Sequence, residues 1–199
     1  MKKIKTIDLL EGLRTDTRQI ILQTNHLLRE DPETLLQQPA EGKWSVAQVI
    51  EHLNSYGRYY LPLVEVSVSA RKFPPNEFYR PGWLGDYFTN AMKPKINGQI
   101  TNKMQAPKSH RPSRDIGNDI VLKEFLEQER LLLGLLDKAE GVNLEKSRIP
   151  ISISRFIKLQ LGDTFRFLVA HHQRHFVQVN NTLKAVKQSQ SDSLRLHGV

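Results

Sequence analysis

The chain has 199 residues, of which 39% are hydrophobic and 25% charged, which is typical of an ordinary globular protein with one core. It contains no cysteine, which excludes disulfides, a thiolate nucleophile and any metal site built on cysteine. The net charge is +8, but the basic residues are dispersed, a pattern that does not favour a nucleic-acid-binding surface. No segment approaches the ~20 apolar residues of a membrane span. We therefore expect a soluble, cytoplasmic protein with no membrane contact.

The first helix is predicted over about residues 7–29, because apolar residues recur there with helical spacing and an Asp-Pro pair follows. The second helix, over about residues 45–64, has the clearest start signal in the chain. Ser45 and Gln48 have the spacing of a capping box, in which each side chain bonds the backbone N–H of the other residue. Pro62 lies inside this helix and predicts either a kink or an early end to its regular part.

Residues 71–117 are the least regular part of the sequence and contain six prolines. Aromatic residues are also frequent there, which argues against disorder. We expect a partly ordered loop with a short helix near residues 84–91, packed over one end of the molecule. Its aromatic residues around Trp83 and Tyr87 either cover the functional site or form a dimer contact, and the sequence does not decide between them.

Two more helices are predicted, over about residues 118–138 and 161–185, and no segment has a convincing strand pattern. The expected fold class is therefore all-α, a four-helix bundle with a long, partly ordered crossover between helices 2 and 3. Residues 1–186 would form a single domain. Residues 187–199 are polar and predict a frayed C-terminal tail.

Histidines near the end of the chain are the most informative feature for function. His171 and His175 are spaced i, i+4, so on a helix they lie on one face, where two imidazoles can share a metal ion. His172 and His175, spaced i, i+3, form a competing pair. The spacing alone gives His171 only a mild preference.

A metal site needs at least a third protein ligand, which must come from elsewhere in the chain. His52 is the candidate, because it lies at the edge of the predicted inward face of the second helix. His26 lies on a mainly polar turn and His110 in a segment of lysine, arginine and proline, so both are weaker candidates.

Two segments carry a resemblance to a known family: residues 42–53 (GKWSVAQVIEHL) and residues 170–178 (AHHQRHFVQ). With these motifs the chain resembles the DinB/YfiT-like superfamily of four-helix-bundle metalloproteins. In that family a Trp-Ser helix start leads to a metal-binding histidine eight residues on, and a late H-x-x-x-H-x-x-Q helix supplies two more. The resemblance implies three metal ligands: His52, His171 and His175. It also decides against His172.

Three neutral imidazoles would leave a divalent ion with open coordination positions, as in catalytic sites. Such an ion lowers the pKa of bound water toward ~7 or holds a substrate thiolate, so no protein residue beyond metal-bound water is assigned a catalytic role. The resemblance implies a metal-dependent hydrolase or a transferase using a low-molecular-weight thiol, since bacillithiol transferases and a mycothiol-dependent maleylpyruvate isomerase belong to the superfamily. All-imidazole ligation suits zinc, nickel or iron. The expected partner is a small-molecule substrate.

Residues that support the ligands are harder to assign. Gln178 and Glu51 are the candidates for hydrogen bonds to the ligand imidazoles, although Glu51 points about a quarter-turn away from His52. A rival hypothesis is a stress-associated binding protein that has a structural or vestigial metal site and works through an interface, of which a homodimer contact is one form. A fourth protein ligand closing the site would favour this rival, and an open coordination position would favour the enzyme.

Overall fold

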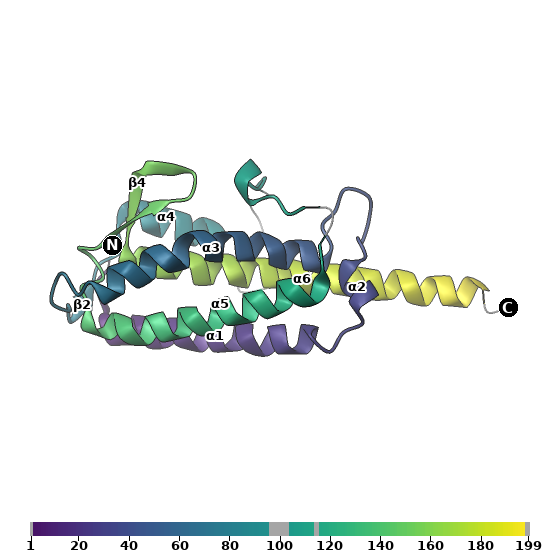
Figure 1. Ribbon diagram of the computed structural model, residues 1–199, viewed down its shortest axis with the longest axis horizontal. Coiled ribbons are helices and arrows are strands. Elements are labelled where there is room, and N and C mark those ends of the chain that lie inside the picture. The colour runs from purple at the N-terminus through teal and green to yellow at the C-terminus, as the bar shows by residue number, and fades with distance from the viewer. Residues whose placement is uncertain (1, 96–103, 114–115, 198–199) are drawn as a thin grey trace.

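The computed structural model describes residues 2–95, 104–113 and 116–197. Within these residues the chain is mostly helical, and four long helices lie side by side along the molecule (Figure 1). They are α1 (Thr6–Leu27), α3 (Val46–Ser69), α5 (Asn118–Lys138) and α6 (Leu161–His197). Helix α3 packs against both α5 and α6, and α1 packs against the same two helices. The apolar faces of the four helices therefore enclose a common interior.

The remaining elements are short. Two further helices are α2 (Pro32–Leu36) and α4 (Trp83–Met92), with single 3₁₀ turns η1 (Lys108–His110) and η2 (Ala139–Gly141). The strands are β1 (Ile4–Lys5), β2 (Phe78–Tyr79), β3 (Arg148–Ile151) and β4 (Ser154–Gln160). Each pairs antiparallel with one partner, β1 with β2 and β3 with β4. None of the helices in the described part of the chain has the length and apolar character to cross a membrane.

The predicted start of α3 is confirmed. Ser45 Oγ accepts a hydrogen bond from the Gln48 N–H at 3.2 Å, and the Ser45 N–H donates to Gln48 Oε1 at 3.0 Å. The expectation that Pro62 ends the regular helix early is wrong, because α3 continues to Ser69. Leu61, Val64 and Val68 are all buried around the proline. Their burial offsets the cost of about 3 kcal/mol that an interior proline brings.

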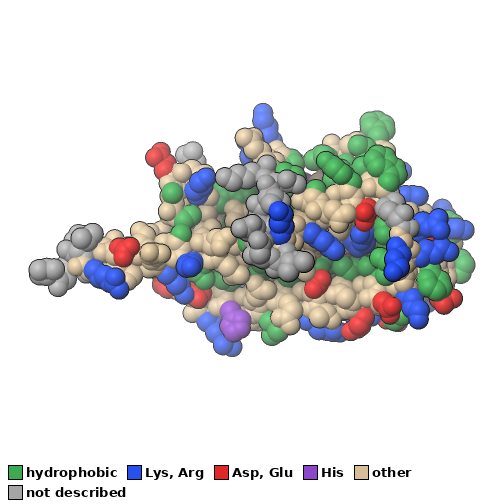
Figure 2. Space-filling model, turned by 180° about the vertical axis from the view of Figure 1, so that it is seen from behind, with side chains coloured by type: hydrophobic (Ala, Val, Ile, Leu, Met, Phe, Trp, Pro, Cys, Tyr) green, Lys and Arg blue, Asp and Glu red, His purple; other side chains and the backbone are tan. Residues whose placement is uncertain are grey.

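The expectation of a chain without strands is also wrong, because β3 and β4 form a hairpin with Ile149 opposite Leu159. Most of β4 is exposed, so the alternation of apolar and polar residues that identifies a half-buried strand is missing. The hairpin projects from the helices, and apolar side chains gather on it (Figure 2). Among them, Ile153 and Phe156 are 62% and 97% exposed.

The middle of the chain contains the predicted short helix, α4, which packs on α6. Asp163 of α6 holds the segment before α4 in place: its carboxylate accepts hydrogen bonds from the Tyr79 hydroxyl (2.5 Å) and the Gly82 N–H (2.9 Å). Arg166, one turn further along α6, pairs with Asp86 of α4 at 2.7 Å. The short helix is thus fixed against the long helix that carries the clustered histidines.

Helix α6 begins at Leu161 as predicted but continues to His197 instead of ending at about residue 185. Residues 187–197 are therefore helical where the sequence predicted a frayed tail. The extension has a partner, because the Gln190 amide donates hydrogen bonds to Gln37 Oε1 (2.9 Å) and Thr34 Oγ1 (3.2 Å) in and after α2. A polar helical segment without apolar periodicity is stabilised by its tertiary contacts. Such contacts cannot be read from the sequence of the segment itself.

Two apolar clusters fill the interior, one near the hairpin and one near α2. On α6 the first ends at Ala170 and the second resumes at Phe176. On α3 the second ends at Leu53 and the first begins at Tyr56. The boundary between the clusters is therefore a layer of polar side chains, and the clustered histidines of α3 and α6 lie in it.

Candidate metal centre

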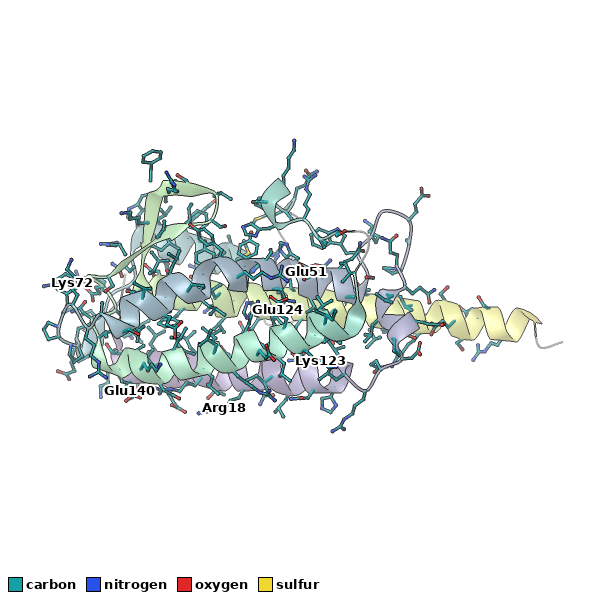
Figure 3. The ribbon with its side chains drawn as sticks, viewed as in Figure 1. Arg18, Glu51, Lys72, Lys123, Glu124 and Glu140 are labelled. Atoms are coloured by element: carbon teal, nitrogen blue, oxygen red, sulfur yellow. The ribbon has the colours of Figure 1, made fainter. Side chains whose placement is uncertain are left out.

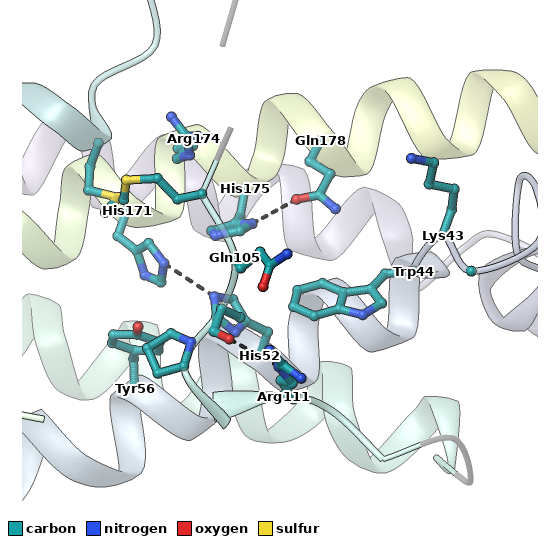
Figure 4. Close-up of a pocket in the computed structure, with 15 residues that line it drawn as sticks. Lys43, Trp44, His52, Tyr56, Gln105, Arg111, His171, Arg174, His175 and Gln178 are labelled. Carbon is teal, nitrogen blue, oxygen red and sulfur yellow. Dashed lines mark hydrogen bonds between the residues drawn. The ribbon is translucent and has the colours of Figure 1, made fainter. Parts of the chain in front are cut away.

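The structure brings together three histidines from two helices: His52 from α3, and His171 and His175 from α6 (Figure 4). One ring nitrogen from each lies within 4.8 Å of the others. His52 and His171 are 2% and 3% exposed, and His175 is half-buried. We call this group the histidine cluster. Within the described residues it is the only set of three or more histidine, aspartate or glutamate side chains placed to share an ion.

Hydrogen bonds fix the orientation of two of these rings. His52 Nδ1 lies 2.7 Å from the carbonyl oxygen of His110, and His175 Nδ1 lies 2.9 Å from Gln178 Oε1. Because both oxygens can only accept, each Nδ1 carries the proton, and the Nε2 lone pair of each ring is left for another partner. This is the tautomer that a metal-binding imidazole needs.

The imidazoles are also in the charge state that binds metal. Burial lowers the pKa of His52 to about 4 and the pKa of His175 to about 3. Burial also lowers the pKa of His171 to well below its ordinary value, with the neighbouring histidines contributing in the same direction. All three rings are therefore neutral near pH 7, as metal ligation requires.

The spacing of the ring nitrogens fits a shared ion. His52 Nε2 and His171 Nε2 are 3.3 Å apart. Tetrahedral coordination with metal–nitrogen distances of ~2.0–2.1 Å separates two ligand nitrogens by about 3.3 Å. His171 Nδ1 is buried and has no hydrogen-bond partner among the described residues. A cation shared by the two Nε2 atoms could bind the lone pairs of both rings at once, whereas a hydrogen bond between them requires one ring to give up its lone pair to a proton.

The two predicted supporting residues differ in position. Gln178 contacts His175, but Glu51 is engaged elsewhere: Arg58 Nη1 lies 2.7 Å from Glu51 Oε1, and Arg58 also pairs with Glu124 of α5 at 2.5 Å. Figure 3 shows Glu51 and Glu124 near one another on α3 and α5. Successive residues of a helix are rotated by about 100°, so Glu51 points away from the histidine cluster and toward Arg58.

His110 contributes in a way that the sequence did not indicate. Its ring is not part of the cluster; instead its carbonyl oxygen orients His52, while its Nδ1 lies 2.8 Å from Ser55 Oγ. The ring also stacks on Tyr56, with centroids 3.9 Å apart. Every residue type has a backbone carbonyl, so the sequence cannot show that this one orients His52. Only the path of the chain in the structure does.

His172 turns away from the cluster. Its Nδ1 lies 2.8 Å from Glu129 Oε1 of α5, and its ring packs edge-on against Phe125. Both partners are almost fully buried, His172 at 4% and Glu129 at 1% exposure. The two candidates that the spacing left open, His171 and His172, therefore have separate environments.

The histidine cluster opens into a pocket of about 650 Å³, a size suited to a small molecule (Figure 4). Among the described residues, three cationic side chains line it, Lys43, Arg111 and Arg174, and no acidic one does. The exposed aromatics Trp83 and Tyr87 do not line it. An anionic molecule would therefore be attracted to this pocket.

Comparison with known proteins agrees with these observations. The family model of the DinB superfamily matches residues 10–179, which include all three histidines of the cluster. The chain belongs to the DinB superfamily. Neither a curated protein nor a solved structure matches it.

Proposed function

We propose that this protein is a metal-dependent enzyme acting on a small molecule, with one divalent ion (zinc, nickel or iron) held by His52, His171 and His175. The observation that carries the proposal is the convergence of three neutral imidazoles, two buried and one half-buried, on a pocket of about 650 Å³. The described residues offer no fourth histidine or carboxylate to the same ion, as a closed structural site would require. We also propose that α1, α3, α5 and α6 form the four-helix bundle that the family resemblance implies.

The chain's own residues have distinct tasks in this proposal. An ion held by three imidazoles supplies positive charge and an open coordination position for polarising or ionising a substrate group. The His110 carbonyl and the Gln178 amide hold two of the imidazoles in place. Burial raises the pKa of Tyr56 to about 12, so its phenol stays protonated. Tyr56 lines the pocket beside His171 and can donate a hydrogen bond to an oxygen or sulfur that becomes negative during reaction.

Between the two reaction types, we favour transfer involving a low-molecular-weight thiol over hydrolysis. None of the described residues that line the pocket is a carboxylate, so none of them can act as an acidic side chain that removes a proton from water. A thiol ionises near pH ~8.5 and needs far less help than water to become a nucleophile. The cationic lining suits an anionic thiol as well.

The first experiment is metal analysis of tag-free protein by elemental mass spectrometry, together with His52→Ala and His175→Ala. We expect about one equivalent of metal in the parent and its loss in both variants. His26→Ala, an exposed histidine on α1, is the matched control and should keep the metal. A parent that stays empty after incubation with zinc, nickel and iron would contradict the proposal and favour the binding-protein alternative.

A second experiment separates the two reactions. Cobalt(II) replaces the native ion, and the protein is titrated with a thiol such as cysteine. A new near-ultraviolet sulfur-to-cobalt charge-transfer band, absent in His52→Ala, would support thiol transfer. No band, together with metal-dependent hydrolysis of a chromogenic ester, would overturn the preference and leave hydrolysis as the reaction.

A further inference from the structure

A second, smaller pocket adjoins the pocket of the histidine cluster. Its volume is about 240 Å³. The two pockets share five lining residues: Tyr56, Met92, Met104, Gln105 and Pro107. They therefore meet along a common wall, and we call the smaller one the apolar chamber.

The chamber differs from the larger pocket in chemistry. None of the described residues that line it is charged, whereas three described cations line the larger pocket. Its other walls are aromatic or aliphatic, apart from Ser152: Tyr60, Phe88, Ile151, Ile153, Leu159 and Phe167. Such a surface favours an apolar group over water.

The walls of the chamber are fixed by specific contacts. The Ser152 N–H donates a hydrogen bond to the Tyr60 hydroxyl at 3.0 Å, and the Tyr59 hydroxyl donates to the Ile151 carbonyl oxygen at 3.2 Å. These bonds attach the hairpin to α3. On the opposite side, the ion pair between Asp86 and Arg166 at 2.7 Å holds α4, which supplies Phe88 and Met92, against α6. These two sides of the chamber are thus held by contacts within the protein, so little ordering of them is needed when a ligand enters.

We propose that the substrate is a small molecule of two parts, an anionic group beside the histidine cluster and an apolar body of about one ring in the apolar chamber. Lys43, Arg111 and Arg174 face the anionic part. The size follows from the volume: an apolar cavity of about 150 Å³ holds benzene, so 240 Å³ suits one substituted ring or an alkyl chain of similar bulk. This inference rests on the proposed function, because it takes the histidine cluster as the reaction centre.

Titration calorimetry with three probes tests the two parts separately, on both the zinc-loaded and the metal-free protein. Phenylphosphonate carries a ring and an anion, methylphosphonate only the anion, and benzyl alcohol only the ring. We expect phenylphosphonate to bind about 10- to 100-fold more tightly than methylphosphonate, since the ring enters the chamber. Benzyl alcohol should bind more weakly than phenylphosphonate by at least about tenfold, since it lacks the attraction to the cations.

Two substitutions on the hairpin show where the ring binds. Ile153→Asp places a carboxylate on the chamber wall, while Phe156→Asp changes an equally apolar, exposed residue of the same hairpin outside it. We expect Ile153→Asp to remove most of the advantage of phenylphosphonate over methylphosphonate, and Phe156→Asp to leave it within about twofold. Met104→Gln, at an exposed side chain that lines both pockets, provides a second test if Ile153→Asp unfolds in circular dichroism.

The outcomes keep this inference distinct from the proposed function. Equal affinities for phenylphosphonate and methylphosphonate, in protein that binds one equivalent of metal, would overturn the apolar chamber and leave the metal centre intact. If Ile153→Asp and Phe156→Asp reduced the advantage of phenylphosphonate over methylphosphonate equally, the apolar chamber would also be overturned. Failure to bind any metal would instead overturn the proposed function, while the preference for the ring would still be measured on the metal-free protein.

Discussion

Two histidines that are neighbours in sequence occupy opposite environments in this protein. His171 joins His52 and His175 beside a pocket whose lining, in the part of the chain that the structure describes, includes no acidic residue. His172 lies within 2.8 Å of the carboxylate of Glu129, against Phe125 and away from that pocket. Both are almost fully buried, so burial alone does not separate a candidate ligand from a structural residue.

The difference lies in what each imidazole meets. His172 has a carboxylate of the facing helix as its neighbour, with Nδ1 2.8 Å from Glu129 Oε1, and it does not line the pocket. The histidine cluster contains only neutral rings, two of which have their Nδ1 protons already committed to carbonyl oxygens. Ring nitrogens that converge beside an open pocket indicate a ligand site, whereas a ring that faces a carboxylate away from that pocket indicates a structural one.

The largest expected effect is a loss of metal affinity when His171, but not His172, is replaced by alanine. His171→Ala should lower metal affinity by more than about 100-fold, because even residues that only support a ligand contribute 10- to 100-fold. His172→Ala should keep one equivalent of metal. Competition with a chromophoric chelator measures both affinities. Equal metal loss in both variants would break the distinction between the two histidines.

For His172 we expect an effect on folding stability and none on metal binding. Glu129→Ala leaves His172 without its buried partner and should lower the free energy of unfolding by about 3 kcal/mol, while metal stoichiometry is unchanged. Denaturant titration measures the change, and Glu127→Ala, an exposed residue of the same helix, should alter it by less than about 0.5 kcal/mol.

The paired substitution Glu129→Met with His172→Leu sharpens this result. Because two buried polar partners can often be replaced together by apolar residues of similar volume, the double variant should recover most of the lost stability. It should still bind one equivalent of metal. If the double variant loses its metal, the Glu129–His172 pair supports the histidine cluster directly and is more than structural.

Local sequence signals explain which parts of the molecule were predictable. The capping box at Ser45 and the i, i+4 spacing of His171 and His175 involve residues close in sequence, and helix geometry alone relates them. The choice of His171 over His172 came from the family resemblance, since spacing gave only a mild preference. That His52 lies beside His171 and His175 depends on how α3 packs on α6. The family motif implied this arrangement, but local periodicity did not.

Features that depend on distant partners were missed. The partner of His172 is Glu129, 43 residues earlier and indistinguishable in sequence from a solvated helix charge. His52 is oriented by a backbone carbonyl, which no residue type encodes. The hairpin is held by the hydroxyls of Tyr59 and Tyr60, so its mostly exposed second strand carries no alternating pattern of its own.

A smaller effect is expected from acid on the metal-free protein. Unfolded histidine has a pKa of about 6.5, while burial lowers the pKa of His52 to about 4 and that of His175 to about 3. Between these values the unfolded chain binds more protons than the folded protein, so stability is full above pH 6.5 and falls as the pH decreases toward 4. We expect a loss on the order of 1–2 kcal/mol between pH 6.5 and 5.5.

Denaturant titration of the metal-free protein at a series of pH values measures this dependence. If the histidine cluster is its source, His52→Leu should flatten the curve, because one of the buried groups that resists protonation is removed. An unchanged slope in His52→Leu would assign the acid sensitivity to other groups.

The smallest expected effect concerns Gln178, which accepts the Nδ1 proton of His175 and so fixes the tautomer of that ligand. Gln178→Ala should lower metal affinity by about tenfold, since the ring loses its orientation but keeps its nitrogen. Gln188→Ala, an exposed glutamine on the same helix, should leave the affinity unchanged. Gln178→Glu separates orientation from charge: a carboxylate restores the acceptor and adds negative charge, so the affinity should equal or exceed that of the parent. A loss in Gln178→Glu as large as in Gln178→Ala would show that the contact with His175 does not support the ligand.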